Sequence, residues 1–362
     1  MKRYNSEFYK EFKRYYAALK IFRFFCGHLY VYSCIFKDLF RKKTGLERQY
    51  HHPRNIVLKL HDLCNARCTF CYARKEDAAE NSGSVTIDEW KDIIDQAASI
   101  GCYTVTFSGG EPLIYPGIYE LIAYSRKKKM LSFMSTNGIA LTSESAKRLE
   151  QSGLCALNFS ILGPGAYHDN ATGIKGSYES IVKNSTVAIQ STKIICIVNH
   201  VLTNESAQKH WPDLIWKDMK SLGFRALSIL PLCLSGSSDA GLLDENSIRY
   251  LDELARRDYV LMDTKNYSQV MCPAAREDLL VNNFGDVQPC PFIPISFGNV
   301  RNNSLKSIFM RMQKHPMFRP RRNVCMPARD RQFIAEYLMP VFRKGNLPVC
   351  INELEKILKN AG

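Results

Sequence analysis

The alternation of strand-like and helix-like segments between residues 55 and 262 restricts the fold of this chain more than any other feature. Six strand-like runs are each followed by a helical stretch. The runs cover residues 56–60, 103–107, 131–135, 156–161, 193–201 and 226–230. Six β/α units in succession predict an α/β fold with a parallel sheet and right-handed crossovers. No dinucleotide-type glycine fingerprint follows the first run, so a full or partial barrel fits as well as an open sheet.

Local signals at the helix ends agree with this pattern. Thr86 followed by Glu89 has the sequence of a capping box, which marks a helix start. Gly101, Gly153 and Gly223 each follow a predicted helix and precede the next strand, where glycine suits a left-handed cap. The helices are therefore expected to end where the strands begin, as β/α units require.

The chain divides into three parts by composition. Residues 1–50 are predicted to form a helical extension in which aromatic and basic residues interleave. This part holds twelve lysines and arginines against four acids, so it carries +8 of the total formal charge of +14. Residues 51–262 form the β/α core. Residues 263–362 lack the β/α rhythm and contain several prolines and cysteines, which predicts a second, smaller domain.

The basic extension leaves two interpretations open. Its most apolar run, residues 24–36, is too short to span a bilayer. A basic, aromatic-rich amphipathic helix can lie on an anionic membrane surface, and it can equally pack on the core with its charged face in water. Because no clean secretory signal precedes the core, we expect a cytoplasmic protein, with peripheral membrane association as one option. No nucleic-acid recognition motif accompanies the charge, so no nucleic-acid partner is expected.

Thirteen cysteines require an explanation. A disulfide framework is disfavoured by the chain length, the odd count and the lack of a secretory signal, which leaves metal binding as the better interpretation. Cys64, Cys68 and Cys71 lie within eight residues at the spacing C-x-x-x-C-x-x-C. Zinc sites usually take four ligands in pairs, whereas a cubane iron–sulfur cluster with three thiolates keeps one iron free for a substrate or cofactor.

With Phe70 before the third cysteine, this segment resembles the signature of the radical S-adenosylmethionine (SAM) superfamily. The resemblance implies a partial (β/α)6 TIM-like barrel and a [4Fe–4S] cluster whose open iron chelates the amine and carboxylate of SAM. It also implies a reducing partner such as flavodoxin or ferredoxin, and cleavage of SAM to a 5′-deoxyadenosyl radical that abstracts hydrogen from a substrate. The cofactor carries this chemistry and the protein orients it. A zinc loop is the alternative.

Further motifs at successive strand ends resemble the same family. Ser108 to Pro112 read S-G-G-E-P, and in the family the G-G-E-P segment binds the amino group of SAM. The candidate cofactor-binding residues are Phe70, Gly109, Gly110, Glu111, Pro112, Ser135, Asn137 and Ser160. Functional sites in β/α folds gather at the C-terminal strand ends, which favours this interpretation over tight turns and structural serines. Leu162 stands where many relatives have aspartate, which makes the pocket more apolar if that side chain faces inward.

A second cysteine group follows the core. Cys272, Gly285 and Cys290 have the spacing C-x12-G-x4-C, which resembles the opening half of a SPASM domain. The later four-cysteine run of that domain is missing, so the resemblance implies the shortened "twitch" form with one auxiliary [4Fe–4S] cluster. Its candidate ligands are Cys272, Cys290, Cys325 and, as a less certain fourth, Cys350; without Cys350 one auxiliary iron stays open. Packed structural thiols are the alternative for Cys325 and Cys350.

The remaining cysteines are expected in the core. Cys233, near the end of the sixth strand, is singled out because some family members use a lone thiol as a hydrogen-atom donor. The sequence does not name the substrate. Since residues 1–50 lack the mixed strands and helices of a leader-peptide-binding domain, a small-molecule or lipid-like substrate is placed ahead of a peptide- or protein-modifying maturase. A non-catalytic iron–sulfur electron carrier explains both cysteine groups but not Gly109 to Glu111.

Overall fold

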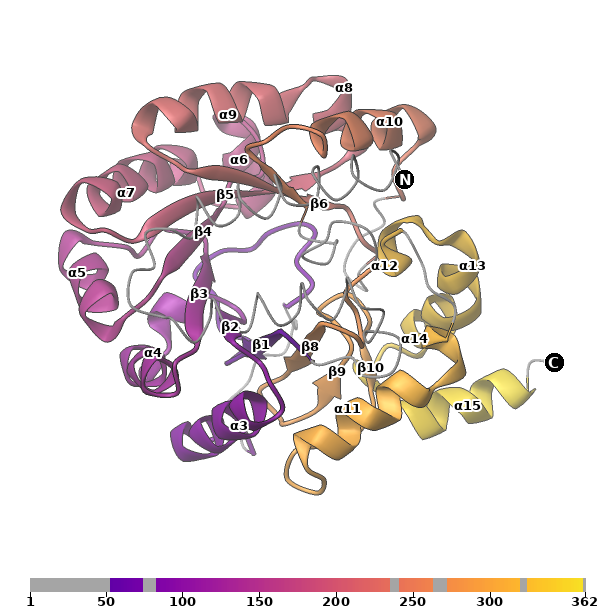
Figure 1. Cartoon of the computed structure of the whole chain (residues 1–362). Coiled ribbons are helices and arrows are strands. Elements are labelled where there is room, and N and C mark those ends of the chain that lie inside the picture. The colour runs from indigo at the N-terminus through magenta and orange to yellow at the C-terminus, as the bar shows by residue number, and fades with distance from the viewer. Residues whose placement is uncertain (1–52, 74–82, 235–240, 263–271, 320–323, 361–362) are drawn as a thin grey trace, which may run out of the picture.

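The computed structural model describes residues 53–73, 83–234, 241–262, 272–319 and 324–360 (Figure 1). The predicted extension over residues 1–50 therefore lies outside the described residues. The dominant element is one sheet with the strand order β7-β6-β5-β4-β3-β2-β1-β8-β9. Its strands are β1 (Asn55–Lys59), β2 (Thr104–Ser108), β3 (Leu131–Thr136), β4 (Ala156–Ser160), β5 (Ile195–Leu202), β6 (Ala226–Pro231), β7 (Val260–Met262), β8 (Asp278–Val281) and β9 (Val287–Gln288).

The six expected strands are present, adjacent in chain order and parallel, which confirms the predicted α/β fold. Figure 1 shows them as an arc with helices on its outer side. Among the described strands, β7 and β9 are the two free edges, so the arc is a partial barrel. The parallel arrangement brings the C-terminal ends of all six strands to one rim.

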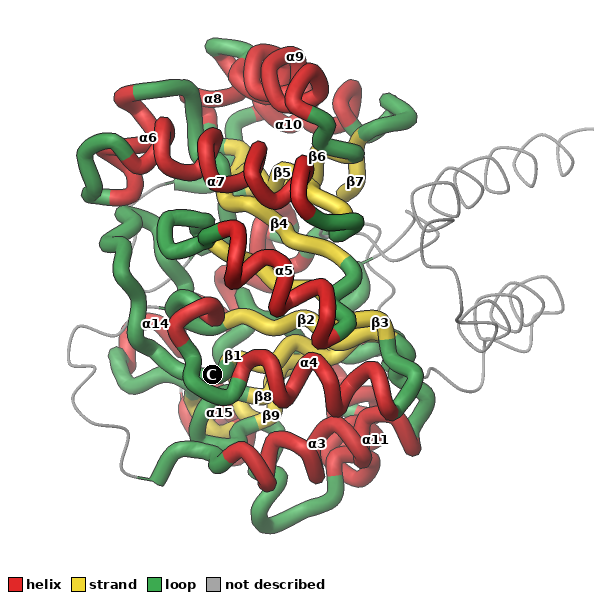
Figure 2. Tube along the Cα trace, turned by 90° about the vertical axis from the view of Figure 1, so that its left-hand side faces the viewer, coloured by secondary structure: helices red, strands yellow, loops and turns green. Residues whose placement is uncertain are grey.

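Helices cover the convex face of the sheet, and Figure 2 shows α4, α5 and α7 lying across the strands. The helices of the core are α3 (Ile87–Ser99), η2 (Pro112–Ile114, a 3-10 turn), α4 (Ile118–Lys127), α5 (Ser143–Ser152), α6 (Ala166–Thr172), α7 (Ser177–Ser191), α8 (Asn204–Gln208), α9 (Trp211–Leu222) and α10 (Glu245–Leu254). Fully buried side chains such as Trp90, Phe107 and Phe159 form the core between helices and sheet. Burial of this apolar surface is the main term that holds the two layers together.

The predicted helix-end signals are confirmed. Both hydrogen bonds of the capping box form at α3, since Thr86 N–H donates to Glu89 at 2.7 Å and Glu89 N–H donates to Thr86 at 3.2 Å. Gly101, Gly153 and Gly223 have φ values of 101°, 100° and 104°. A side chain is strained in this left-handed region, so glycine lets each helix end abruptly before the next strand.

The C-terminal segment continues the sheet of the core. Strand β8 pairs in parallel with β1, so that Asn55 lies between Thr104 on one side and Asp278 on the other. The segment further contains β10 (Ile295–Ser296), α11 (Leu305–Lys314), η3 (Pro316–Phe318), α12 (Met326–Arg329), α13 (Arg331–Phe333), a π-helical turn (Ile334–Leu338), α14 (Met339–Lys344), β11 (Val349–Cys350) and α15 (Ile351–Asn360). A buried ion pair of 2.8 Å between Arg54 and Glu277 joins the segment to the start of β1. No helix in the described ranges has the length and apolarity needed to cross a bilayer.

Candidate active site

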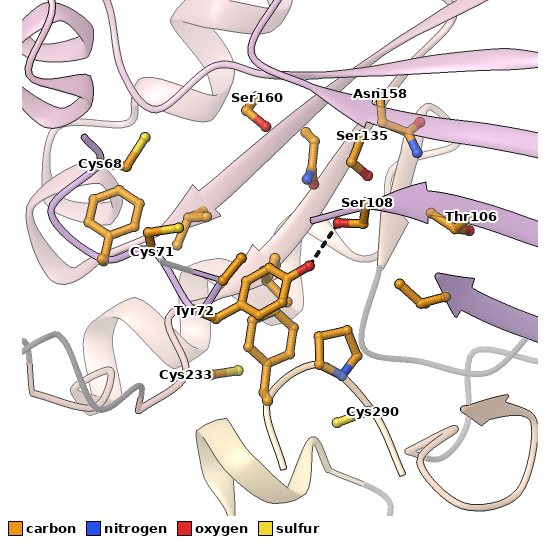
Figure 3. Close-up of a pocket in the computed structure, with 18 of the residues that line it drawn as sticks. Cys68, Cys71, Tyr72, Thr106, Ser108, Ser135, Asn158, Ser160, Cys233 and Cys290 are labelled. Atoms are coloured by element: carbon orange, nitrogen blue, oxygen red, sulfur yellow. Dashed lines mark hydrogen bonds between the residues drawn. The ribbon is translucent and has the colours of Figure 1, made fainter. Parts of the chain in front are cut away.

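A cavity of about 290 Å³ opens at the C-terminal rim of the strands and is lined by both the core and the C-terminal segment (Figure 3). Most residues singled out from the sequence lie here together. They are Cys64, Cys68, Phe70, Cys71, Gly109, Gly110, Glu111, Ser135, Asn137, Ser160, Cys233, Cys272, Cys290 and Cys325. Pro112 and Cys350 are not among the lining residues. Pro112 is the buried first residue of the turn η2, and Cys350 lies exposed on β11.

The first three cysteines lie on the loop that follows β1. The two glycines after β2 pack against the backbone at the start of this loop. A Cβ atom on Gly110 would lie 1.8 Å from the carbonyl oxygen of Leu63. Gly109 has φ of 137°, and a Cβ there would approach the His61 carbonyl oxygen to 2.7 Å. Gly110 N–H donates to His61 at 2.8 Å, and Glu111 N–H donates to Leu63 at 2.9 Å. The close backbone approach that these glycines permit is therefore to the cysteine loop itself.

Glu111 connects the ends of two strands. Its side chain is 1% exposed, and its carboxylate accepts hydrogen bonds from Asn137 N–H at 2.7 Å, the Thr136 hydroxyl at 2.8 Å and Leu113 N–H at 3.0 Å. Burial raises its pKa to about 7, although the three donors oppose that shift. Both oxygens thus have protein partners, and the carboxylate fixes the turn after β3 against the turn after β2.

Asn137 connects Glu111 to the cysteine loop by hydrogen bonds. Its side-chain amide donates to Asn65 Oδ1 at 2.7 Å and lies 3.8 Å from the sulfur of Cys64. Its side-chain oxygen accepts from Ile139 N–H at 3.0 Å, which holds the amide in one orientation. A continuous hydrogen-bonded path therefore runs from Glu111 through Asn137 to the first cysteine.

The second cysteine group lies across the cavity. Cys272, Cys290 and Cys325 are 5%, 8% and 6% exposed. Cys233, which was expected near the sixth strand end, lies with them and packs against Cys325. Tyr72 lies between the two cysteine groups, where its hydroxyl shares a hydrogen bond of 2.8 Å with Ser108 and its ring meets Phe292 edge-on (Figure 3).

Several lining residues were missed from the sequence. They are uncharged polar residues inside strands, namely Thr106, Asn158, Asn199 and Ser228. Each is a polar residue within an apolar strand, and in a barrel such positions face inward, which is the signal that could have found them. Leu162 also lines the cavity, so this departure from the family pattern does face inward.

Comparison with known proteins agrees with this geometry. The Radical SAM superfamily model matches residues 58–215, and an iron–sulfur cluster-binding SPASM domain model matches residues 272–330. The chain is therefore a radical SAM enzyme with a C-terminal SPASM domain. Its cofactors are a [4Fe–4S] cluster, SAM and auxiliary iron–sulfur clusters. The cavity fits these groups, since one loop presents three cysteines to it and further buried cysteines line its opposite wall.

Among curated proteins, the chain is 27% identical over 292 residues to an AdoMet-dependent heme synthase of Nitratidesulfovibrio vulgaris, covering 71% of this chain and 78% of the relative. It is 24% identical to the subtilosin biosynthesis protein AlbA of Bacillus subtilis, covering 74% of this chain and 61% of the relative. Among solved structures, Streptococcus suis SuiB bound to its precursor peptide SuiA superposes with a TM-score of 0.59 at 17% identity, over 76% of this chain and 68% of SuiB. This last similarity establishes the fold.

Proposed function

We propose that this enzyme abstracts a hydrogen atom from an uncharged polar substrate, and specifically from a segment of peptide. In this proposal Cys64, Cys68 and Cys71 hold the catalytic cluster and leave its fourth iron for SAM. When bound and reduced, these groups supply a 5′-deoxyadenosyl radical at the strand rim. A flavodoxin or ferredoxin is the proposed electron donor. Asn137 orients the cysteine loop, and Gly109, Gly110, Ser135 and Ser160 line the space that SAM would occupy.

The observation that carries the proposal is the chemistry of the inner wall. Apart from the two serines assigned to SAM, hydroxyl and amide side chains from four strands line it, namely Thr106, Asn158, Asn199 and Ser228, and Asp278 is the one further acid among the described lining residues besides Glu111. The side-chain oxygen of Asn199 is buried and accepts no hydrogen bond from any described residue. A buried acceptor of this kind favours a ligand that donates hydrogen bonds, as a peptide amide does.

The same wall disfavours two other substrate classes. An alkyl chain would find apolar partners in Leu162, Val201 and Leu230, but it would also desolvate the amides and hydroxyls without replacing their hydrogen bonds, which weakens the case for a lipid-like substrate. No lysine or arginine lines the cavity within the described ranges, so the carboxylates of a tetrapyrrole would lack cationic partners there. The relationship to AlbA, named for bacteriocin biosynthesis, supports a peptide. The relationship to heme synthase keeps a small molecule as the second candidate.

The test measures where the abstracted hydrogen originates. The enzyme is incubated anaerobically with SAM and dithionite, and with either a uniformly deuterated peptide library or deuterated iron-coproporphyrin III. We expect deuterium in 5′-deoxyadenosine from the peptide alone. Cys68→Ala should abolish 5′-deoxyadenosine, whereas Cys350→Ala should not. Transfer from the tetrapyrrole and not from the peptide would contradict the proposal.

A second variant addresses the inner wall itself. Asn199→Leu removes the buried acceptor, so we expect peptide-dependent deuterium transfer to fall about tenfold, which corresponds to the loss of one hydrogen bond of about 1.4 kcal/mol. Asn199 pairs in register with Ser160, so formation of 5′-deoxyadenosine without substrate is measured alongside and should fall less than the peptide-dependent transfer. Equal loss of both activities would show that the substitution damages the site as a whole.

A further inference from the structure

Cys233 lies outside both matched domain regions, which cover residues 58–215 and 272–330. We propose that Cys233 is a ligand of the auxiliary iron–sulfur cluster, and that Cys233, Cys272, Cys290 and Cys325 form a complete set of four thiolates. Cys350, the fourth ligand expected from the sequence, has no part in this set. The proposal does not depend on which substrate the enzyme takes, only on the presence of the auxiliary cluster.

The position of Cys233 follows from the end of β6. Strand β6 ends at Pro231, and Leu232 N–H donates to the Leu202 carbonyl at 2.9 Å, which keeps the chain beside β5 for one more residue. Cys233 then turns inward with a side chain that is 5% exposed, and its thiol donates to the Pro231 carbonyl at 3.4 Å. In Figure 3 the side chains of Cys233 and Cys290 point into the same space below Tyr72.

Cys325 reaches this space from the C-terminal segment. It occupies the N-cap of α12, where its side chain caps no backbone group, and packs in a small buried cluster with Cys233, Leu230 and Ala328. Its side chain lies near those of both Cys233 and Cys272. The described core therefore brings the β6 end, the start of the SPASM domain and the α12 cap to one point.

The surroundings of these thiols suit a cluster better than isolated packed cysteines. Backbone N–H groups of Ala274 and Met326 lie near the sulfur of Cys272, and that of Phe292 lies near the sulfur of Cys290, while Ile293 N–H donates to the Cys290 carbonyl oxygen at 3.3 Å. Amide donors directed at sulfur stabilise the negative charge of cluster thiolates and tune cluster potentials.

The arrangement favours a cubane over a single metal ion. Within the described ranges, no three cysteine, histidine or carboxylate side chains converge closely enough to hold one ion. A [4Fe–4S] cube binds each thiolate to a different iron, so its ligands surround a wider space. Cys350 lies exposed on β11, where it pairs in register with Ser296 of β10. It does not line the cavity.

The four-thiolate assignment differs from the three-thiolate alternative in whether the auxiliary cluster has an open iron. With four thiolates, every iron of the auxiliary cube is occupied, so the cube has no open iron for a substrate atom and serves only to exchange electrons. Cys233 is then a cluster ligand and not a hydrogen-atom donor, because its sulfur is bonded to iron.

The test uses a chain in which Cys64, Cys68 and Cys71 are replaced by alanine, so that only the auxiliary cluster assembles. Reconstituted anaerobically, this parent should hold about four irons per chain. Cys233→Ala in this background should lose iron to about three per chain and give the EPR signal of a [3Fe–4S] cluster. Cys233→Ser should keep about four irons with an altered EPR spectrum, since a serine oxygen can replace sulfur as a ligand.

Two matched variants serve as controls. Cys350→Ala and Cys196→Ala, the second a buried thiol on β5 outside the cavity, should leave iron content and EPR spectrum as in the parent. The proposal is overturned if Cys233→Ser has the parental spectrum, if Cys233→Ala keeps the parental iron and spectrum, or if Cys350→Ala loses the cluster instead. Because no substrate is added, the iron content and EPR spectrum do not depend on the proposed peptide substrate. A negative result in either experiment therefore does not affect the other.

Discussion

At the scale of single residues, Glu111 illustrates how one buried side chain in the cavity wall can position a cofactor site through its contacts with the protein. Replacing Glu111 with glutamine keeps the shape but places an amide group opposite one of the three donors. We expect Glu111→Gln to lower the free energy of unfolding by about 1–3 kcal/mol, because one buried donor loses its acceptor. Denaturant unfolding, followed by circular dichroism, measures this loss.

The same variant should also weaken SAM binding, since Asn137 would lose the contact that holds it against the cysteine loop. The matched control is Glu179→Gln, an exposed glutamate in the first turn of α7, which should change neither quantity. If Glu111→Gln leaves both stability and SAM affinity unchanged, the hydrogen bonds from Glu111 through Asn137 to the cysteine loop are not needed for either property.

The sequence predicted which residues gather at the site better than it predicted what each one contacts. Gly110 was singled out for close approach to a ligand, and the structure adds a close approach to the Leu63 carbonyl that the sequence did not indicate. Cys233 was expected near the end of a strand, but its contact with Cys325, ninety-two positions later, depends on the curvature of the sheet. Contacts between distant segments follow from packing, which local pattern does not encode.

At the scale of elements, the cysteine loop and the glycine pair behave as one unit. Gly110→Ala would place a methyl group 1.8 Å from the Leu63 carbonyl oxygen, so the loop must move away from the rim. We expect the variant to lose the cluster at Cys64, Cys68 and Cys71 while the auxiliary cluster remains. Iron should then fall from about eight to about four per chain.

Iron analysis and the EPR spectrum of the reduced protein measure this change. Gly241→Ala is the matched control, because a Cβ there meets no atom within 4 Å. If Gly110→Ala keeps about eight irons, the loop tolerates displacement and the glycine has another role.

The elements themselves were predictable where local chemistry sets them. The capping box at Thr86 and the glycines after α5 and α9 marked true helix ends. The short strand β8 was missed because four residues such as Asp278–Val281 carry too little periodicity to be assigned, and their partner β1 lies more than two hundred residues earlier. Long-range parallel pairing is set by the assembled barrel.

At the scale of the whole molecule, β8 explains why one cavity contains both cysteine groups. The pairing of β8 with β1, and the ion pair between Arg54 and Glu277, attach the C-terminal segment to the strand that carries the first cysteine loop. The two cluster sites are therefore held on one sheet. A substrate between them meets walls whose relative position is fixed by backbone hydrogen bonds.

Two buried histidines should lower the stability of the whole molecule in mild acid, in opposition to Glu111, whose raised pKa of about 7 favours the folded state as the pH falls. His168 accepts a hydrogen bond from Leu162 N–H at 3.1 Å, and His200 lies 2.8 Å from the Ile161 carbonyl oxygen, so both hold the end of β4. Burial lowers the pKa of each to about 4, whereas an exposed histidine in the unfolded chain titrates near about 6.5. Between these values the unfolded chain binds more protons than the folded one, so stability is full above about pH 6.5 and declines as the pH falls towards about 4.

From about pH 7.5 to about pH 5.5 this linkage amounts to about 1.4 kcal/mol for each histidine. His168→Gln keeps a side chain that can accept a hydrogen bond from Leu162 N–H but cannot titrate. The free energy of unfolding that is lost between the two pH values should therefore be smaller in the variant by the share of one histidine, about 1.4 kcal/mol. Denaturant unfolding at both pH values measures the difference, with His210→Gln as an exposed control that leaves the slope as in the parent. A pH dependence that is equal in His168→Gln and the parent would mean that His168 does not stay neutral in the folded protein, and that other groups set the acid limit of the fold.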